Sequence, residues 1–163
     1  KETLEIYKKL FVLFPKGEEI RQKTFDYIMA ESLNMVQSTD ALRIQKGLDI
    51  ALELNKIDPT HFYVQNRIIY AYTGLAKLEI EKKNWDEAQR LVEKGLKMRF
   101  DSEAMRIRLN ILTEEAKEFI AQKKYEEARE NLEDVIDIAT IDENKAIYPE
   151  ELQVAEELIK RIQ

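Results

Sequence analysis

The sequence predicts an all-α protein built from stacked pairs of antiparallel helices. A polar turn followed by an aromatic residue, two acids and an alanine occurs twice, at Asn84–Ala88 and at Lys124–Ala128, 40 positions apart. Self-similarity at a period of about 20 to 50 residues is typical of helical repeat proteins. Apolar residues also recur at helical spacing along the chain, and only four Gly and three Pro are present to form turns between short strands.

Length and charge narrow the class of protein. At 163 residues the chain suits the usual domain size of about 100 to 200 residues, and we expect a single domain over residues 1–163. The net charge of −6, with Lys and Arg interleaved among acids, argues against binding of nucleic acid, which needs clustered basic residues. No apolar run approaches the roughly 18 residues of a membrane span. We therefore expect a soluble protein with protein or peptide partners.

The sequence alone does not determine the cellular compartment. The absence of cysteine removes disulfides, thiolate nucleophiles and Cys-ligated zinc, but it suits cytosol and periplasm equally. The chain starts at Lys1 without an initiator Met or a signal-like segment, so we expect a piece of a longer or processed protein.

Eight helical stretches separated by short joints are expected at about residues 4–14, 18–36, 41–57, 61–83, 85–99, 103–123, 125–141 and 150–163, leaving 142–149 as the longest loop. Pro15 and Gly17 end the first stretch and Pro59 follows the third, because these residues break helices. Residues 37–40 supply capping hydroxyls and a carboxylate for the third, Thr60 can cap the fourth, and Asp101 with Ser102 can cap the sixth. The last stretch is apolar on one side only, as expected of a helix that caps a repeat stack.

The two clearest helix pairs resemble tetratricopeptide repeats (TPR). In that family, helix A carries a small residue near its middle, and helix B opens with aromatic-x-x-Ala and continues with bulky and small apolar residues. One unit is matched by Leu75, Ala76, Trp85, Ala88, Val92, Gly95 and Leu96, and the next by Ala116, Phe119, Tyr125, Ala128, Leu132, Val135 and Ile136. The resemblance implies a right-handed α-solenoid whose helix A faces line a concave, protein-binding surface.

The rest of the chain follows the TPR pattern less closely. Residues 4–15 are similar to a helix B with its terminal Pro, and residues 41–59 resemble another helix B without the aromatic opening. The resulting division is a half-repeat at 1–17, repeats at about 18–59, 60–100 and 101–141, and a capping helix at about 150–163. Because the period of 40 exceeds the family's 34, we expect a divergent TPR-like solenoid.

Few residues could support catalysis. His61 is the only histidine and follows a potential helix cap, so we expect a surface or capping role rather than a metal ligand. Neither a phosphate-binding glycine loop nor a nucleophile elbow occurs. We therefore expect no enzyme activity, no cofactor and no metal site.

An acidic run between Glu126 and Glu143 is opposed only by Arg129. Such a run could bind calcium or a basic partner, but the oxygen-ligand spacing of an EF-hand is not present. We expect a solvated helix face instead.

The expected partner-binding face lies on helix A of two adjacent repeats. Thr and Lys recur 40 positions apart, at spacings that place them on one side of each helix. The candidate residues are Asn66, Tyr70, Thr73 and Lys77 in one helix and Arg106, Asn110, Thr113 and Lys117 in the next. Because Lys and Arg form charge-assisted hydrogen bonds with carboxylates, we expect a scaffold or adaptor that binds a peptide or protein segment in this groove.

Three alternatives stay open at this point. Shared ancestry of the repeats would produce the same polar face without any binding role. The half-repeat exposes Tyr7, Phe11 and Phe14, which could stack on a second copy of the chain and give a homo-oligomer. As a small-ligand or peptide-signal sensor, the protein would instead enclose a compact molecule with residues of the same face, including Tyr70.

Overall fold

The computed structural model describes residues 5, 9, 18–141 and 147–162. Over this part the chain forms seven α-helices and no strand, so the all-α prediction is confirmed. Apart from residues 5 and 9, the expected first helix and half-repeat, with Tyr7, Phe11 and Phe14, lie outside the described residues.

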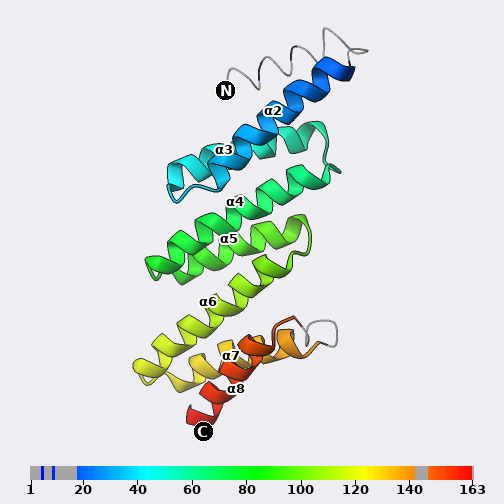
Figure 1. The fold of residues 1–163 in the computed structure, drawn as a ribbon. Coiled ribbons are helices and arrows are strands. Elements are labelled where there is room, and N and C mark those ends of the chain that lie inside the picture. Colours follow the sequence, from blue (N-terminus) through cyan, green and yellow to red (C-terminus); the bar gives the residue numbers. More distant parts are fainter. Residues whose placement is uncertain (1–4, 6–8, 10–17, 142–146, 163) are drawn as a thin grey trace. The chain divides into compact units, whose positions relative to one another are not determined.

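The helices follow the expected order, and their limits agree with the sequence prediction to within two residues. They are α2 (Glu18–Val36), α3 (Ala41–Ile57), α4 (Phe62–Glu81), α5 (Trp85–Met98), α6 (Ser102–Ala121), α7 (Tyr125–Thr140) and α8 (Pro149–Ile162) (Figure 1). Asp40 and Asp101 cap α3 and α6 as expected, because their carboxylates accept the backbone N–H groups of Arg43 and Ala104, each at 3.0 Å.

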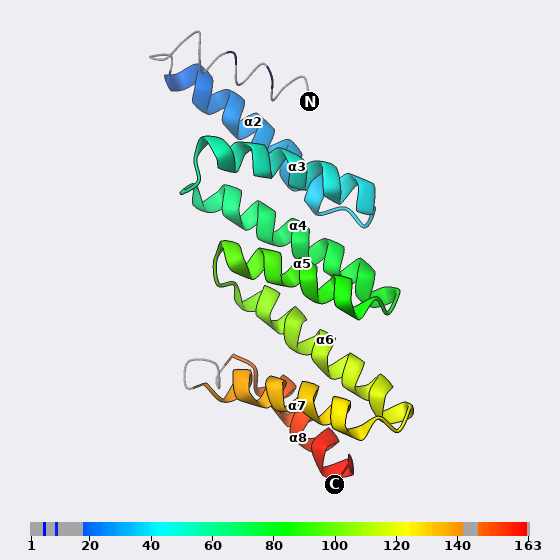
Figure 2. The same cartoon turned by 180° about the vertical axis from the view of Figure 1, so that it is seen from behind.

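The chain divides into two compact units, residues 1–78 and 79–163. In the described part of the first unit, α2 and α3 form an antiparallel pair that is followed by most of α4 (Figure 1). In the second unit α5, α6 and α7 each pack on the next helix, and α8 also packs on α6 (Figure 2). Packing between sequential neighbours is consistent with stacked antiparallel helices.

The α2–α3 pair of the first unit meets at Gly47. A Cβ atom added at this glycine would lie 2.7 Å from Val36 Cγ1, 2.8 Å from Met35 Cβ and 3.1 Å from the Ser32 carbonyl oxygen. The buried Ser32 hydroxyl donates a hydrogen bond of 3.0 Å to the Gly47 carbonyl oxygen. The two helices approach this closely because position 47 has no side chain.

Apolar side chains of α2, α3 and α4 form the core around this contact. Its buried members in the first unit are Phe25, Ile28, Met29, Val36, Ile44, Leu48, Ala51, Leu54, Val64, Ile68, Ile69, Ala71 and Ala76. The contact at Gly74 of α4 is looser than the contact at Gly47. A Cβ added at Gly74 would lie 3.5 Å from Ile44 Cδ1 of α3, which is an ordinary van der Waals distance.

A core shared by α6, α7 and α8 holds the second unit together. Its buried members are Leu109, Leu112, Ala116, Ala128, Leu132, Val135, Ala139, Tyr148 and Ala155. Tyr148 is fully buried, and its hydroxyl donates to the Ser102 carbonyl oxygen at 3.1 Å. The sequence placed Tyr148 in a loop, so this anchor was not predicted.

The turn that begins α5 contains a residue in the left-handed region without glycine. Lys83 has a φ of 59°. The Asn84 N–H donates to the Glu79 carbonyl oxygen, and the Lys83 N–H donates to the Ile80 carbonyl oxygen, both at 2.9 Å. This pair of hydrogen bonds is the Schellman motif, which satisfies carbonyl groups at the end of a helix.

The turn before α7 repeats this conformation. Lys123 has a φ of 64°, and its N–H donates to the Ile120 carbonyl oxygen at 3.0 Å. The Lys124 N–H donates to the Phe119 carbonyl oxygen at 2.9 Å. Lys124 has φ and ψ of −90° and 72°, against −91° and 73° for Asn84. The sequence repeat is therefore also a repeat of backbone conformation within the second unit.

Substituting Gly47→Ala should destabilise the first unit. A side-chain atom at this contact forces a shift that costs about 1–3 kcal/mol, and the gain in helix propensity of about 1 kcal/mol offsets only part of it. The matched control is Gly74→Ala, which meets only ordinary contacts and should be neutral or stabilising by up to about 1 kcal/mol. Urea unfolding followed by circular dichroism gives both values. Equal effects of the two substitutions would contradict the assigned close contact.

Substituting Lys123→Gly should stabilise the second unit by about 0.5–1 kcal/mol, because glycine adopts positive φ without the steric cost that a Cβ brings. Lys83→Gly should gain less, since it also removes an ion pair between Lys83 and Glu118. Thermal unfolding of the two variants and the parent measures the difference. A Lys123→Gly protein that melts below the parent would show that this turn is not strained.

Candidate functional site

The face expected to bind a partner is divided between the two units. The candidate residues are Asn66, Tyr70, Thr73 and Lys77 on α4 in the first unit and Arg106, Asn110, Thr113 and Lys117 on α6 in the second. Each set follows one helix within its own unit, and their assembly into a single groove stays a prediction.

The two threonines occupy the same environment. Thr73 and Thr113 are each only 6% exposed. The Thr73 hydroxyl donates to the Tyr70 carbonyl oxygen and the Thr113 hydroxyl to the Leu109 carbonyl oxygen, both at 2.9 Å. Both hydroxyls are therefore satisfied within their own helix, and these side chains contribute to packing rather than to an exposed surface.

The other candidates are mostly on the surface. Asn66 is partly buried, whereas Tyr70, Lys77, Asn110 and Lys117 are exposed. Lys117 pairs with Glu114 at 2.6 Å, and both side chains of this pair are about half exposed. Since an exposed pair contributes only about 0–1 kcal/mol, a partner carboxylate could replace Glu114 at little cost.

Arg106 is exposed but is engaged by α8. Its Nε donates to Glu151 Oε1 and one Nη donates to the Ile147 carbonyl oxygen, each at 3.0 Å. The guanidinium also lies 5.8 Å from the centre of the Tyr148 ring. Arg106 therefore fixes the start of α8 against α6. The sequence signal for this junction is Pro149, because proline is favoured at the first position of a helix.

Glu118 joins α6 to the turn before α5 within the second unit. Its carboxylate accepts the indole N–H of Trp85 at 2.8 Å and also accepts a hydrogen bond from Lys83. Trp85 is the aromatic residue that opens helix B in the TPR-like pattern, and the structure adds a polar contact for this side chain. The Glu118 carboxylate of α6 is therefore hydrogen-bonded both to the turn before α5 and to the first residue of α5.

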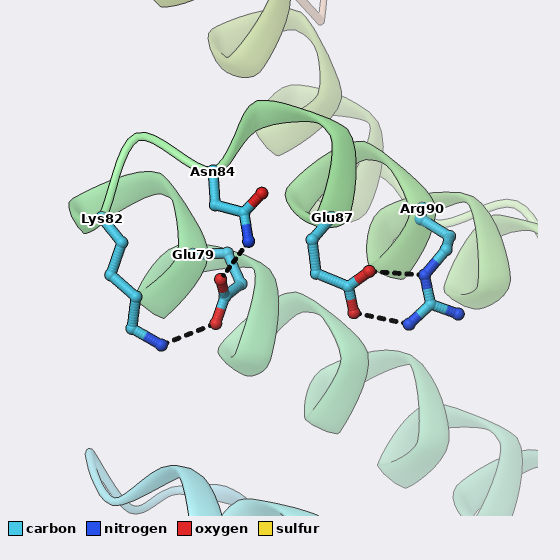
Figure 3. Close-up of polar contacts among 5 residues, drawn as sticks. All are labelled: Glu79, Lys82, Asn84, Glu87 and Arg90. Carbon is cyan, nitrogen blue, oxygen red and sulfur yellow. Dashed lines mark hydrogen bonds and ion pairs between the residues drawn. The ribbon is translucent and has the colours of Figure 1, made fainter.

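A second polar cluster surrounds this turn (Figure 3). Glu79 accepts hydrogen bonds from Lys82 at 2.7 Å and from the Asn84 side-chain amide at 2.8 Å. Glu87 receives two hydrogen bonds from Arg90. The Glu79 contacts link the end of α4 to the turn, whereas the Glu87–Arg90 pair lies within α5.

The acids of both clusters have lowered pKa values. Hydrogen bonds from Lys83 and then Trp85 lower the pKa of Glu118 below its ordinary value of 4.5. Lys82 and Asn84 lower the pKa of Glu79 in the same way. A hydrogen bond from Arg90 likewise lowers the pKa of Glu87, so these contacts favour the charged form of all three carboxyl groups.

The remaining candidates are placed as follows. His61 is partly buried at the start of α4, and its ring centre lies 4.7 Å from that of Phe25. The acids of α7 are exposed, and Arg129 lies 4.0 Å from Glu126. In the described part of the chain, no three His, Asp or Glu side chains gather closely enough to hold a metal ion. No described helix combines the length and apolar character that crossing a membrane requires.

Comparison of the chain with protein-family models, with curated proteins and with solved structures finds no match. The residues and contacts described above therefore carry the functional argument.

Substituting Glu118→Gln should make the second unit less sensitive to acid. A carboxyl group with a lowered folded-state pKa stabilises the protein above its unfolded value and loses that contribution as the pH falls through its folded value. The parent should therefore be more stable than the variant near neutral pH, and this difference should shrink below pH 4.5. Urea unfolding across this pH range, with the exposed Glu130→Gln as control, measures it. A difference that does not change with pH would contradict the ion-pair assignment.

Proposed function

We propose that this chain is a protein-interaction module of TPR-like helix pairs, and that its helix A faces bind a peptide or protein segment with carboxylate side chains. The observation that carries the proposal is the matched position of two exposed lysines. Lys77 and Lys117 are exposed, and each follows by four positions a buried threonine that is hydrogen-bonded to its own helix. Each unit therefore presents a cation at an equivalent place on its helix A.

The repeated turns support the TPR-like architecture. Two Schellman turns with matched dihedral angles precede α5 and α7, and each leads into an aromatic-x-x-Ala helix start. Ala88 and Ala128 are fully buried in these helices, as the resemblance requires for close helix packing. Equivalent turns and equivalent small residues are what successive units of a helical repeat protein share.

The chemistry of the exposed side chains favours an acidic partner. Lysine ammonium groups form charge-assisted hydrogen bonds with carboxylates, and the amide of Asn110 can add a neutral donor. On the helix A face of the first unit, the Tyr70 side chain is 50% exposed and suits contact with an apolar side chain of the partner. Such mixed polar and aromatic surfaces are typical of peptide recognition.

The test is binding of an array of peptides biased toward Asp and Glu, measured with the parent and with the double variant Lys77→Glu/Lys117→Glu. Reversing the charge at both positions should weaken binding of the tightest-binding peptides more than about tenfold, since a charge-assisted hydrogen bond contributes about 1.5–3 kcal/mol. Circular dichroism should show unchanged helicity.

The matched control is Lys46→Glu/Lys97→Glu, which makes the same change in net charge at exposed positions of α3 and α5. This control should retain binding if the helix A faces are the recognition surface. Equal loss in both double variants would indicate non-specific attraction, and no loss in either would remove the assignment.

A further inference from the structure

A hollow of about 340 Å³ lies between α2 and α3 of the first unit. Five residues of α2 and one of α3 line it: Tyr27, Ala30, Glu31, Asn34, Met35 and Arg43. Tyr27 is 57% exposed, and Ala30, Asn34 and Arg43 are also exposed. None of these residues belongs to the helix faces of α4 and α6 discussed above.

Arg43 brings a positive charge to the lining of the hollow. Its guanidinium donates to the side-chain oxygen of Asn34, so among the described residues its acceptor is an amide rather than a carboxylate. By contrast, the exposed Arg90 and Arg106 each pair with a glutamate. A guanidinium carries five N–H donors in a fork that matches a carboxylate, and the Asn34 amide has two more. The Arg43 and Asn34 side chains together therefore suit a carboxylate ligand.

The other lining residues offer apolar surface, one phenol and one acid. Ala30 and Met35 supply apolar surface, and the Tyr27 ring adds an aromatic edge. Glu31 accepts a hydrogen bond from the Tyr27 hydroxyl at 3.3 Å. A single arginine beside a glutamate favours a ligand with one negative charge over a phosphate dianion, because the second charge would meet Glu31 without a cation.

The spacing of the lining residues suits an extended chain that lies along the hollow. Tyr27 and Asn34 are seven positions apart, which corresponds to about 10 Å along a helix. Three residues of an extended peptide cover about the same distance, and residues i and i+2 point to the same side. An acidic and an aliphatic side chain two positions apart would therefore face the two kinds of surface together.

We propose that this hollow binds an extended peptide segment, with an acidic side chain on Arg43 and Asn34 and an aliphatic side chain two residues away over Ala30 and Met35. The site rests on the proposed peptide-binding function but uses different residues. Glu31 gives it selectivity, since a second acid in place of the aliphatic side chain meets a like charge.

The test is titration of the ¹⁵N-labelled full chain with the peptide acetyl-Ser-Glu-Ser-Leu-Ser-amide, followed by NMR. Its blocked ends leave the glutamate as the one carboxylate. The backbone amide signals of Asn34 and Arg43 should shift in a saturable way. Arg43→Gln should weaken this binding by about tenfold or more. Lys46→Gln, the same change of charge at an exposed position of the same helix, should leave it unchanged.

Three further peptides separate the possible occupants. Replacing the glutamate by glutamine, or the leucine by serine, should each abolish the shifts. A third peptide with glutamate in place of the leucine should bind the parent poorly and the Glu31→Gln protein better. Absence of saturable shifts with the first peptide, or equal weakening in Arg43→Gln and Lys46→Gln, would overturn the proposal.

The same titration distinguishes this site from the proposed function as a whole. Lys77→Glu/Lys117→Glu should leave binding of the blocked peptide unchanged, because neither lysine lines the hollow. If the blocked peptide does not bind the hollow, but binding to the peptide array still depends on Lys77 and Lys117, only the present inference is removed. The opposite result would remove only the helix A assignment.

Discussion

Close contact between helices at small side chains is the constraint on which this structure depends. Each helix from α3 to α8 has at least one completely buried alanine in the described part of the chain, and α2 places the buried Ser32 against Gly47. The alanines are Ala51, Ala71, Ala76, Ala88, Ala104, Ala116, Ala128, Ala139 and Ala155. A larger side chain at such a contact pushes the helix axes apart, and every neighbouring contact then loses packing energy.

Polar contacts orient the helices that these small residues bring together. In the second unit, Glu118 accepts hydrogen bonds from Lys83 and Trp85 at the start of α5. Arg106 donates hydrogen bonds to Ile147 and Glu151 at the start of α8. Both groups lie at helix ends, where unsatisfied backbone groups and short loops leave the geometry least determined. Packing therefore sets how close the helices come, while charged side chains fix where each helix begins relative to its neighbour.

Helix limits and the capped starts of α3 and α6 were predictable from the sequence because they depend on neighbouring residues. Asp40 and Asp101 each accept a backbone N–H that lies only three positions away. The expected cap at Thr60 is not formed, because the Thr60 hydroxyl donates to Asp58 instead. Tyr148 was not predictable, because its hydrogen-bond partner Ser102 lies 46 positions away and no local pattern links them. The role of Gly47 was missed for the same reason. Of the candidate face, the buried threonines could not be told from exposed ones by spacing alone, and the hollow around Arg43 exists only once α2 and α3 are paired.

The buried alanines also bear on how such a sequence changes over time. Their positions restrict the volume of the side chain, whereas the exposed sides of the same helices accept almost any polar residue. Selection on this architecture therefore conserves a pattern of sizes along the chain more strongly than a pattern of identities. Two descendants of one ancestor can keep the same helix spacing after most of their residues have diverged.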